Sequence, residues 1–219
     1  MENMIDIHNA GIKFGKWSLD GIELKIPKGY ITGVVGHNGA GKTTFLNMIM
    51  GLYPGMKGSI SVGGYDCVKQ REKMLDITGF VSQEREFFME YSAIENEDMY
   101  IPFYSKWDSE KYRKYLKSMN VPCVTKLKSL SKGSYIKYQL AFALANKPSL
   151  LILDEPAAGL DPVFRADFLK LLQELIADEK MTIVISSNIE DDLDKIADYI
   201  VEVKDGGCRM KEAYEYYKK

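Results

Sequence analysis

The sequence contains no apolar run near 18 residues long and no N-terminal signal pattern. We therefore expect the chain neither to span nor to cross a membrane by itself. It also lacks an excess of either charge, with 29 basic and 31 acidic side chains and no long basic run. A formal net charge of −2 gives no electrostatic footprint for nucleic acid, so we expect no nucleic-acid partner. These absences predict a cytoplasmic protein that reaches a membrane only through a partner.

Cysteine is scarce and ungrouped. Cys67, Cys123 and Cys208 are widely separated and have no metal-ligand spacing, so we expect reduced structural thiols. Internal repeats and low-complexity segments are absent as well. With 219 residues, of which 46% are hydrophobic, the chain is long enough to bury a substantial core.

A glycine-rich segment stands between the apolar run at residues 31–35 and a helical pattern that ends before Gly51. Residues 36–44 form a complete G-x-x-x-x-G-K-T nucleotide motif. In such a loop the backbone N–H groups curl around phosphate oxygens, Lys42 supplies a cation to the β- and γ-phosphates, and Thr43 offers a hydroxyl to Mg²⁺. The sequence therefore predicts binding of ATP or GTP with Mg²⁺. The expected nucleotide-binding residues of the loop are Gly36, Asn38, Gly39, Ala40, Gly41, Lys42, Thr43 and Thr44.

A second apolar run, at residues 150–153, ends in Asp154 and Glu155. Such a run is typical of a buried parallel strand, and ligands in open α/β sheets bind beyond the carboxyl ends of the strands. We therefore expect both strands to end at one site, where Asp154 holds Mg²⁺ and Glu155 orients the water that attacks the γ-phosphate. A charged strand end in a solvated turn is the alternative interpretation.

These two segments and three others, in the same order, resemble the ATP-binding-cassette (ABC) family of transport ATPases from about Ile12 to about Val203. Gln83 stands at the family's glutamine loop, and residues 130–134, Leu-Ser-Lys-Gly-Ser, stand at its Leu-Ser-Gly-Gly-Gln signature. Residues 158–162, Ala-Gly-Leu-Asp-Pro, match its dimer-contacting loop. Asn188 stands where the family usually has a switch histidine.

The resemblance implies an α/β fold: a P-loop NTPase core with a mainly parallel sheet, an N-terminal antiparallel β subdomain and a helical insert subdomain. Residues 1–219 would form a single ABC ATPase domain, with 1–83 and 150–219 in the nucleotide-binding core and 84–149 in the helical subdomain. The residues that follow Gly207 show little pattern.

The resemblance also implies an activity and partners. The chain would hydrolyse ATP, bound with Mg²⁺, and couple hydrolysis to transport by a separate integral membrane permease at the inner face of the cell membrane. The signature variant is similar to those of bacterial exporter cassettes for drugs, peptides or lipids. An import-type cassette, or a soluble non-transport cassette that acts as a regulatory or nucleic-acid clamp, are the alternatives.

Two cassettes of the family pack head to tail, as a homodimer or a heterodimer. The resemblance therefore implies that Ser131 and Gly133 bind the nucleotide of the opposite chain and that Asp161 lies at the dimer seam. Gln83 would sense metal and water together with Asp154. Lys132 and Ser134 replace the glycine and glutamine of the usual signature, and we interpret them as a subfamily mark.

Phe14 stands where the family has an aromatic residue that stacks on adenine. A ring there would favour a purine without reading its edges. The alternative is that Phe14 is a core residue of the N-terminal strands, and neighbouring Trp17 could take its place at the base.

Asn188 would be part of the catalytic machinery, as a weaker donor than histidine to the γ-phosphate. Asparagine can donate a hydrogen bond but has a shorter reach and no positive form. Loss of such a donor can slow hydrolysis on the order of 10²-fold, by analogy with deleted oxyanion donors. We therefore expect weak intrinsic turnover. A helix cap is a second interpretation of Asn188, compatible with the first.

Bulky apolar residues lie between the glutamine loop and the helical insert, namely Phe87, Phe88, Met89 and Tyr91. Such a cluster suits a groove for a cytoplasmic helix of the membrane subunit. A core for the helical subdomain is an equally weighted alternative.

Overall fold

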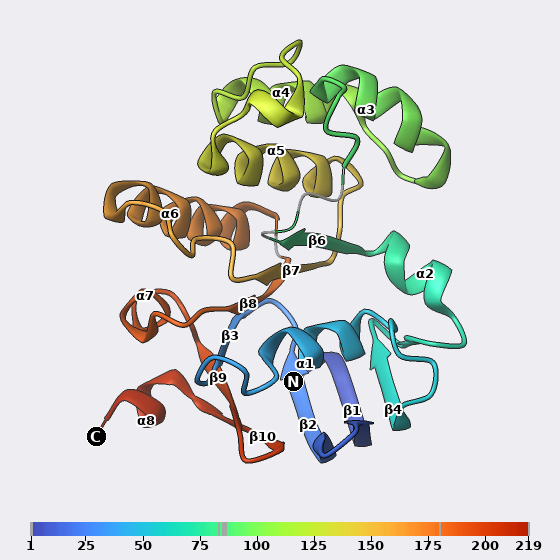
Figure 1. Ribbon diagram of the computed structural model, residues 1–219, viewed down its shortest axis with the longest axis vertical. Helices are drawn as coiled ribbons and strands as arrows, with labels where there is room; N and C mark the ends of the chain where they lie inside the picture. Colours follow the sequence, from blue (N-terminus) through green and yellow to red (C-terminus); the bar gives the residue numbers. More distant parts are fainter. Residues whose placement is uncertain (1, 83, 85–86, 180, 219) are drawn as a thin grey trace.

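The computed structural model describes residues 2–82, 84, 87–179 and 181–218, the side chains of 178 and 179 excepted. Its strands form an antiparallel sheet in the order β2-β1-β4-β5 and a mainly parallel sheet in the order β10-β9-β3-β8-β7-β6 (Figure 1). The strands are β1 (Asn3–Phe14), β2 (Trp17–Pro27), β3 (Ile31–Val35), β4 (Lys57–Val62), β5 (Tyr65–Asp66), β6 (Thr78–Ser82), β7 (Leu150–Asp154), β8 (Thr182–Ser186), β9 (Tyr199–Lys204) and β10 (Gly207–Glu212).

Helices α3, α4 and α5 lie together at one end of the molecule, and α6 lies beside α5 (Figure 1). Helix α1 follows β3 after the glycine-rich segment at residues 36–41 and packs against the antiparallel sheet. The helices are α1 (Lys42–Ile49), α2 (Arg71–Asp76), α3 (Ala93–Tyr100), η1 (Ile101–Phe103), α4 (Ser109–Ser118), η2 (Leu127–Ser129), α5 (Lys132–Ala145), α6 (Pro162–Glu179), α7 (Glu190–Asp194) and α8 (Ala213–Tyr217). None of the described helices is long and apolar enough to cross a lipid bilayer.

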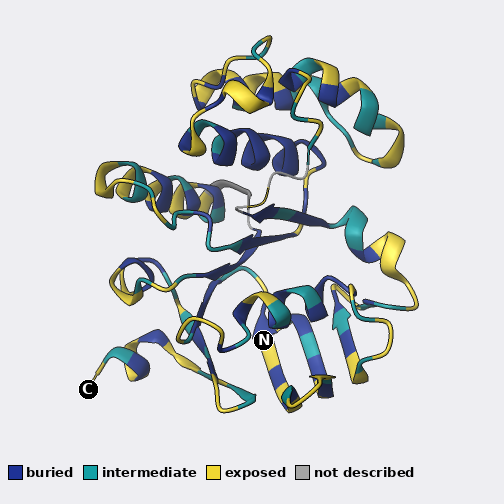
Figure 2. Cartoon of the chain, viewed as in Figure 1, coloured by how far each residue is buried: buried dark blue, intermediate teal, exposed yellow. Residues whose placement is uncertain are grey.

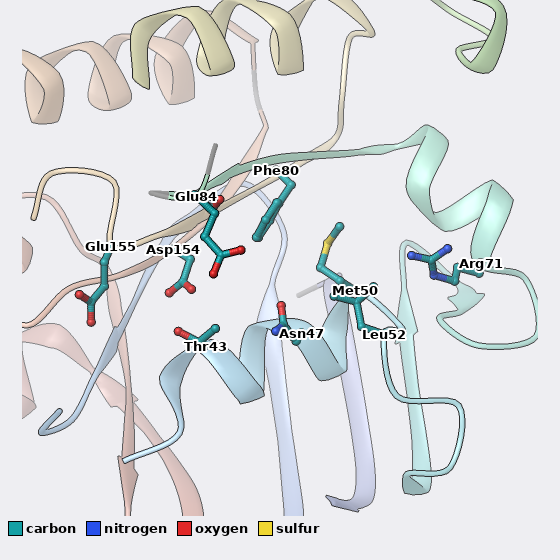
Figure 3. Close-up of a pocket in the computed structure, with 10 residues that line it drawn as sticks. Thr43, Asn47, Met50, Leu52, Arg71, Phe80, Glu84, Asp154 and Glu155 are labelled. Carbon is teal, nitrogen blue, oxygen red and sulfur yellow. Dashed lines mark hydrogen bonds between the residues drawn. The ribbon is translucent and has the colours of Figure 1, made fainter. Parts of the chain in front are cut away.

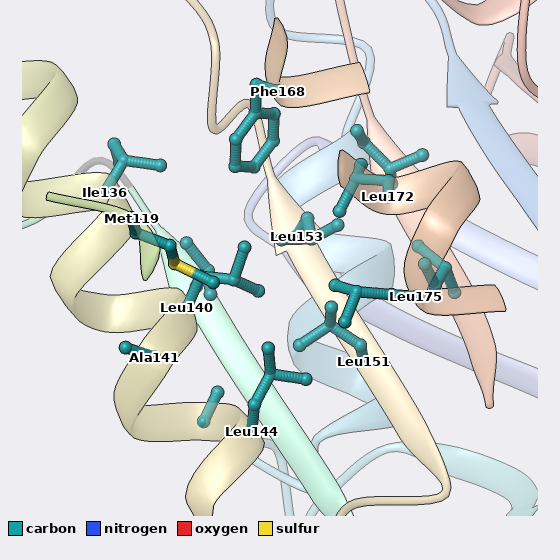
Figure 4. Packing of buried hydrophobic residues seen from close by; sticks show 14 of the residues in the cluster. Met119, Ile136, Leu140, Ala141, Leu144, Leu151, Leu153, Phe168, Leu172 and Leu175 are labelled. Carbon is teal, nitrogen blue, oxygen red and sulfur yellow. The ribbon is translucent and has the colours of Figure 1, made fainter. Parts of the chain in front are cut away.

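The central parallel strands are buried on both faces, which explains their continuous apolar sequences. Every residue of β3 and β8 is buried (Figure 2). In β7 the side chains alternate between two cores. Leu151 and Leu153 join α5 and α6 in one core, whereas Leu150 and Ile152 join α1 and the antiparallel sheet in the other (Figure 4). The parallel sheet therefore separates the helical layer from the N-terminal β layer.

Helix α5 is the main support of the helical layer. Tyr135, Tyr138 and Phe142, which share one face at helical spacing, are all buried. On the side that faces the sheet, Ala143 packs on Gly79, where an added Cβ would lie 3.0 Å from the Ala143 Cβ. A side chain at this position of β6 would therefore require α5 to move away from the strand.

The sequence-based fold class is confirmed: the chain is α/β, with one mainly parallel and one antiparallel sheet and added helices. The C-terminal residues form regular structure although their sequence shows little pattern: β10 pairs with β9 in an antiparallel register, and α8 follows β10. Their sequence shows little periodicity since β10 is an edge strand with mostly exposed or half-buried side chains.

The cysteines are free thiols, as their spacing predicted. Cys67 is fully buried, and burial raises the pKa of its thiol to about 11. It therefore stays protonated at neutral pH and behaves as a small apolar core residue.

Candidate functional site

The register of three parallel strands places the two sequence motifs at one edge of the sheet. Ser186, the last residue of β8, pairs with Val34 of β3 on one side and with Asp154 of β7 on the other. The glycine-rich segment leaves β3 immediately beyond Val35, and Glu155 follows β7. The two motifs, more than a hundred residues apart in sequence, thus meet as predicted.

The glycine-rich segment curls into the N-terminus of α1. Gly41 is the residue before the helix and has a φ of 110°, a conformation that a residue with a side chain rarely adopts. An added Cβ at Gly41 would also lie 2.6 Å from the Trp17 ring. The amide groups at the start of α1 have no partners within the helix, so this segment is a suitable cradle for phosphate oxygens.

Lys42 lies at the centre of the site and is nearly buried, with 5% of its side chain exposed. Its Nζ donates a hydrogen bond to the Gly36 carbonyl oxygen at 3.0 Å and lies 3.2 Å from a Glu155 carboxylate oxygen. The cation expected to bind phosphate and the carboxylate expected to orient water are therefore in direct contact.

Ser186 orients the acidic pair. Its Oγ donates to Asp154 Oδ1 at 2.6 Å and accepts the Glu155 N–H at 2.9 Å. Glu155 has a φ of 46°, the left-handed conformation that non-glycine residues seldom adopt. Such strain is held only where the surroundings determine the backbone, and Ser186 supplies one of these constraints. The alternative of a loosely solvated strand end does not fit this arrangement.

A cleft of about 550 Å³ opens beside these groups (Figure 3). Thr43, Asp154 and Glu155 line it, together with Glu84. A second cleft of about 580 Å³ shares Thr43 and Glu155 and continues past Lys42 to Phe14 and Trp17. The two clefts form one site, with carboxylates at one end and aromatic rings at the other.

The aromatic end is formed by Phe14 and Trp17, whose rings stack with centroids 6.1 Å apart. Phe14 is 47% exposed, so the interpretation of this residue as part of the core is wrong. The Tyr53 ring also contacts Phe14 in an edge-to-face arrangement, with the two centroids 5.4 Å apart. Both Phe14 and Trp17 face the same cleft as the phosphate loop, which is the place where a base attached to bound phosphates would lie.

Ser131, Gly133 and Asp161 lie together around a different cavity of about 390 Å³. Ser131 precedes α5, and its Oγ accepts the Ser134 N–H at 3.2 Å, so Ser131 caps the N-terminus of this helix. None of the three residues lines either part of the phosphate-loop cleft. Within one chain, therefore, the signature and the phosphate loop belong to separate surfaces.

Gln83 and Asn188 are the other two predicted catalytic residues. Gln83 lies outside the described residues. Asn188 is exposed beyond the end of β8, two residues after Ser186. Its interpretation as a helix cap is wrong, because α7 begins at Glu190 after Ile189, and Ser187 Oγ rather than Asn188 accepts the Ile189 N–H, at 3.0 Å. The chain stays extended at Ile189, which delays the helix by a residue.

Sequence reasoning missed Ser186 and Glu84 as residues of this site. Ser186 had a usable signal, since it ends an apolar strand just as Asp154 does and parallel strand ends meet at one edge. Glu84 had none, because nothing in its immediate sequence links it to the strand ends that form the site.

A further cleft, of about 610 Å³, lies between α2 and β6 on one side and α3, η1 and α5 on the other. Phe87 lines it and is also part of the core, with its ring centroid 4.8 Å from that of Phe142. Phe88 and Tyr91 are instead 49% and 44% exposed. Of the four residues of this segment, only Phe87 lines the cleft, Phe87 and Met89 pack against the core of the helical layer, and Phe88 and Tyr91 are exposed outside the cleft. Other aromatic residues of the cleft, which sequence reasoning missed, are Phe80, Tyr100, Phe103, Tyr104 and Phe142.

Comparison with known proteins agrees with this geometry. Residues 19–158 match the family model described as ABC transporter. The chain is 32% identical over 217 residues to the energy-coupling factor transporter ATP-binding protein EcfA2 of Clostridium perfringens, which covers 94% of this chain and 76% of that protein. It is 31% identical over 209 residues to the linearmycin resistance ATP-binding protein LnrL of Bacillus subtilis, and this match covers 93% of this chain and 67% of LnrL.

Solved structures show the same fold. The structure of cbiO1 from Clostridium perfringens, described as part of the ABC transporter complex cbiONQ, matches with a TM-score of 0.85 at 23% identity. The match covers 100% of this chain and 92% of cbiO1. The ADP conformation of the ATP-binding cassette MJ1267 matches with a TM-score of 0.83 at 24% identity, covering 98% and 93%.

The position of Trp17 predicts a fluorescence signal for nucleotide binding. The chain contains 2 tryptophans, and Trp107 lies in the helical layer away from the cleft. We expect MgATP to quench the emission of Trp17, because the nucleobase would lie against its ring. The Trp107→Phe variant should keep the quench and Trp17→Phe should lose it in a titration. Equal quenching in both variants would contradict the assignment of the aromatic end of the cleft.

Proposed function

The chain belongs to the ABC transporter family, and we propose that ATP turnover at the phosphate-loop cleft drives a separate membrane permease in the export of its substrate. The chain is an ATPase and the ATP-binding subunit of a transporter, and it uses ATP with Mg²⁺. The observation that carries the proposal is the meeting of Lys42, Thr43, Asp154 and Glu155 at one edge of the parallel sheet.

In this proposal the phosphate loop binds the phosphates and the aromatic end binds adenine. Lys42 supplies the cation, and the N–H groups between Gly39 and Thr44 surround the phosphate oxygens. Phe14 and Trp17 offer ring surface to the base without reading its edges, so the preference for ATP over GTP rests on the family. The continuous cleft from Phe14 to Glu155 supports this placement.

The donors at the other end of the cleft fit a magnesium ion. Thr43 and Asp154 present oxygen atoms, which Mg²⁺ prefers, and both line one cleft. Among the residues that the structure describes, no three His, Cys, Asp or Glu side chains are grouped to hold a metal by themselves. Mg²⁺ usually completes its coordination with water and nucleotide phosphates, so two protein donors suffice. Gln83 is proposed as a further contact to the ion and to water.

Glu155 is the proposed water-activating residue. A carboxylate next to the γ-phosphate can orient the attacking water, and Ser186 and Lys42 hold Glu155 at the mouth of the cleft. Asn188 is proposed as a weak donor to the γ-phosphate, which would make turnover slow.

The separate cavity formed by Ser131, Gly133 and Asp161 supports a two-chain site. These residues do not line the phosphate-loop cleft of their own chain, and the positive end of the helix dipole at the start of α5 suits an anion. We propose that a second cassette supplies its nucleotide to this surface, in a homodimer or a heterodimer.

The aromatic cleft between α2 and α3 is the proposed docking site for the permease. It is lined mainly by apolar side chains and lies next to β6, whose end borders the nucleotide cleft through Ser82. Phe80 lines both clefts. A cytoplasmic helix of the permease seated there would therefore contact the same strand that borders the nucleotide.

Glu155→Gln tests the proposed catalytic role. We expect the variant to bind MgATP normally by Trp17 fluorescence but to lose ATP hydrolysis by on the order of 10²-fold or more, since the amide cannot take up a proton from water. Static light scattering should show an ATP-dependent dimer.

Glu174→Gln is the matched control for that experiment, because Glu174 is exposed on α6 and does not line the nucleotide cleft, and it should retain the native activity. Unchanged hydrolysis by Glu155→Gln would disprove the assignment of Glu155 as the water-activating residue.

Asn188→His tests the proposed weak donor. The variant should hydrolyse ATP faster than the native chain if Asn188 limits turnover.

Phe103→Ser tests the docking site. Phe103 is 81% exposed and lines the aromatic cleft, so its loss should reduce permease co-purification while the stability of the chain and its ATP binding stay unchanged. Val124→Ser is the matched control, because Val124 is also 81% exposed and does not line this cleft. Equal permease recovery with both variants would exclude the cleft as the docking site.

The direction of transport rests on relatives and on the signature variant. Relatives include a linearmycin resistance protein and a bacitracin transport protein from Bacillus licheniformis, which favour export, whereas the EcfA2 proteins favour an energy-coupling factor system. We expect cells that express the chain with its permease to tolerate higher concentrations of peptide antibiotics, with the Glu155→Gln chain as control. A requirement of the chain for nutrient uptake would instead indicate import.

A further inference from the structure

Lys132 joins the start of α5 to the loop that follows Glu155. It is the first residue of α5, and its Nζ donates a hydrogen bond of 2.6 Å to the Ala158 carbonyl oxygen. The same Nζ lies 3.3 Å from the position of an added Cβ at Gly159, so the ammonium group sits directly on the peptide between Ala158 and Gly159. A charged donor makes such a bond shorter and stronger than one between neutral groups.

Further contacts hold the same two segments together. The backbone of α5 packs on the Phe164 ring at Gly133, where an added Cβ would lie 2.7 Å from the ring. Lys137 Nζ lies over that ring, 5.2 Å from its centroid. Asp161 Oδ1 in turn accepts the Phe164 N–H at 2.9 Å. Residues 158–164 are thus attached to the first two turns of α5, next to which α6 begins (Figure 1).

The attached loop leads straight to Glu155. The Ala158 N–H donates to the Glu155 carbonyl oxygen at 3.2 Å, closing a turn over residues 155–158. The other side of Glu155 is held by Ser186, which accepts the Glu155 N–H. The backbone of Glu155, with φ at 46°, is therefore held at two places. Ser186 binds the Glu155 N–H, and Lys132 binds the carbonyl oxygen of Ala158, three residues further along the chain.

We propose that Lys132 is a positioning residue for ATP hydrolysis, which holds the 155–158 turn and through it the Glu155 carboxylate. The inference rests on the proposed role of Glu155. Glycine, the residue that the family signature usually has at this position, cannot make this contact because it lacks a side-chain donor. In this chain, the lysine therefore connects the start of α5 to the turn that carries Glu155 of the same subunit.

The test compares Lys132→Met, Lys132→Arg and Lys132→Gly in the full chain. Methionine keeps the length of the stem and removes the donor, whereas arginine keeps a donor. We expect Lys132→Met and Lys132→Gly to lower kcat by roughly 10- to 100-fold, the range that a displacement of about 1 Å costs, with little change in KM. Lys132→Arg should recover most of the rate. Lys170→Met, on an exposed face of α6, is the control and should leave kcat unchanged.

Hydrogen exchange of the loop amides gives a readout that does not depend on catalysis. The Ala158 and Leu160 N–H groups, which are hydrogen-bonded to Glu155 and Ala157, should exchange faster in Lys132→Met and at the native rate in Lys132→Arg. Native kcat in Lys132→Met would overturn the proposal, and so would a change confined to KM, which would indicate a phosphate-binding role instead. If Glu155→Gln also hydrolyses ATP normally, the proposed catalytic role of Glu155 fails, which is a separate result.

Discussion

The hydrogen-bonded ladder of parallel strands β3, β8 and β7 is the constraint on which the rest of this structure depends. A parallel register brings the carboxyl ends of neighbouring strands to one edge, and here that edge receives the phosphate loop, the acidic pair and the Ser186 hydroxyl. A shift of one residue in the β7–β8 register would turn Asp154 and Ser186 to opposite faces. Continuous apolar packing on both faces of these strands is what holds the register.

The helical layer is attached to this edge by packing as well as by the chain. Gly79 allows α5 to approach β6, and Leu151 and Leu153 meet α5 and α6 on the same face of the sheet (Figure 4). The start of α5 then contacts the loop after Glu155 through Lys132 and Phe164. The signature surface is therefore connected to Glu155, the proposed catalytic carboxylate, through the contacts of Lys132 with Ala158 and of Ala158 with Glu155.

The departures from the usual family pattern lie outside the phosphate loop, which is complete. Lys132 and Ser134 lie at the start of α5, and Asn188 lies beyond the end of β8. Under the proposed function, these changes leave the ATP-binding loop as it is, whereas Lys132 and Asn188 alter groups proposed to act in the chemical step.

Local patterns in the sequence predicted which residues bind phosphate and metal, and they determined where the buried strands lie. Each of these depends on neighbours within a few residues, namely glycines that allow a tight loop and continuous apolar runs. Tertiary structure alone decided that Ser186 would orient Asp154, that Lys132 would hold the Ala158 carbonyl, and that aromatic residues from β6, α3, η1 and α5 would line one cleft. These contacts join segments up to 62 residues apart, from Phe80 to Phe142, and depend on strand order and helix packing, which no local periodicity records.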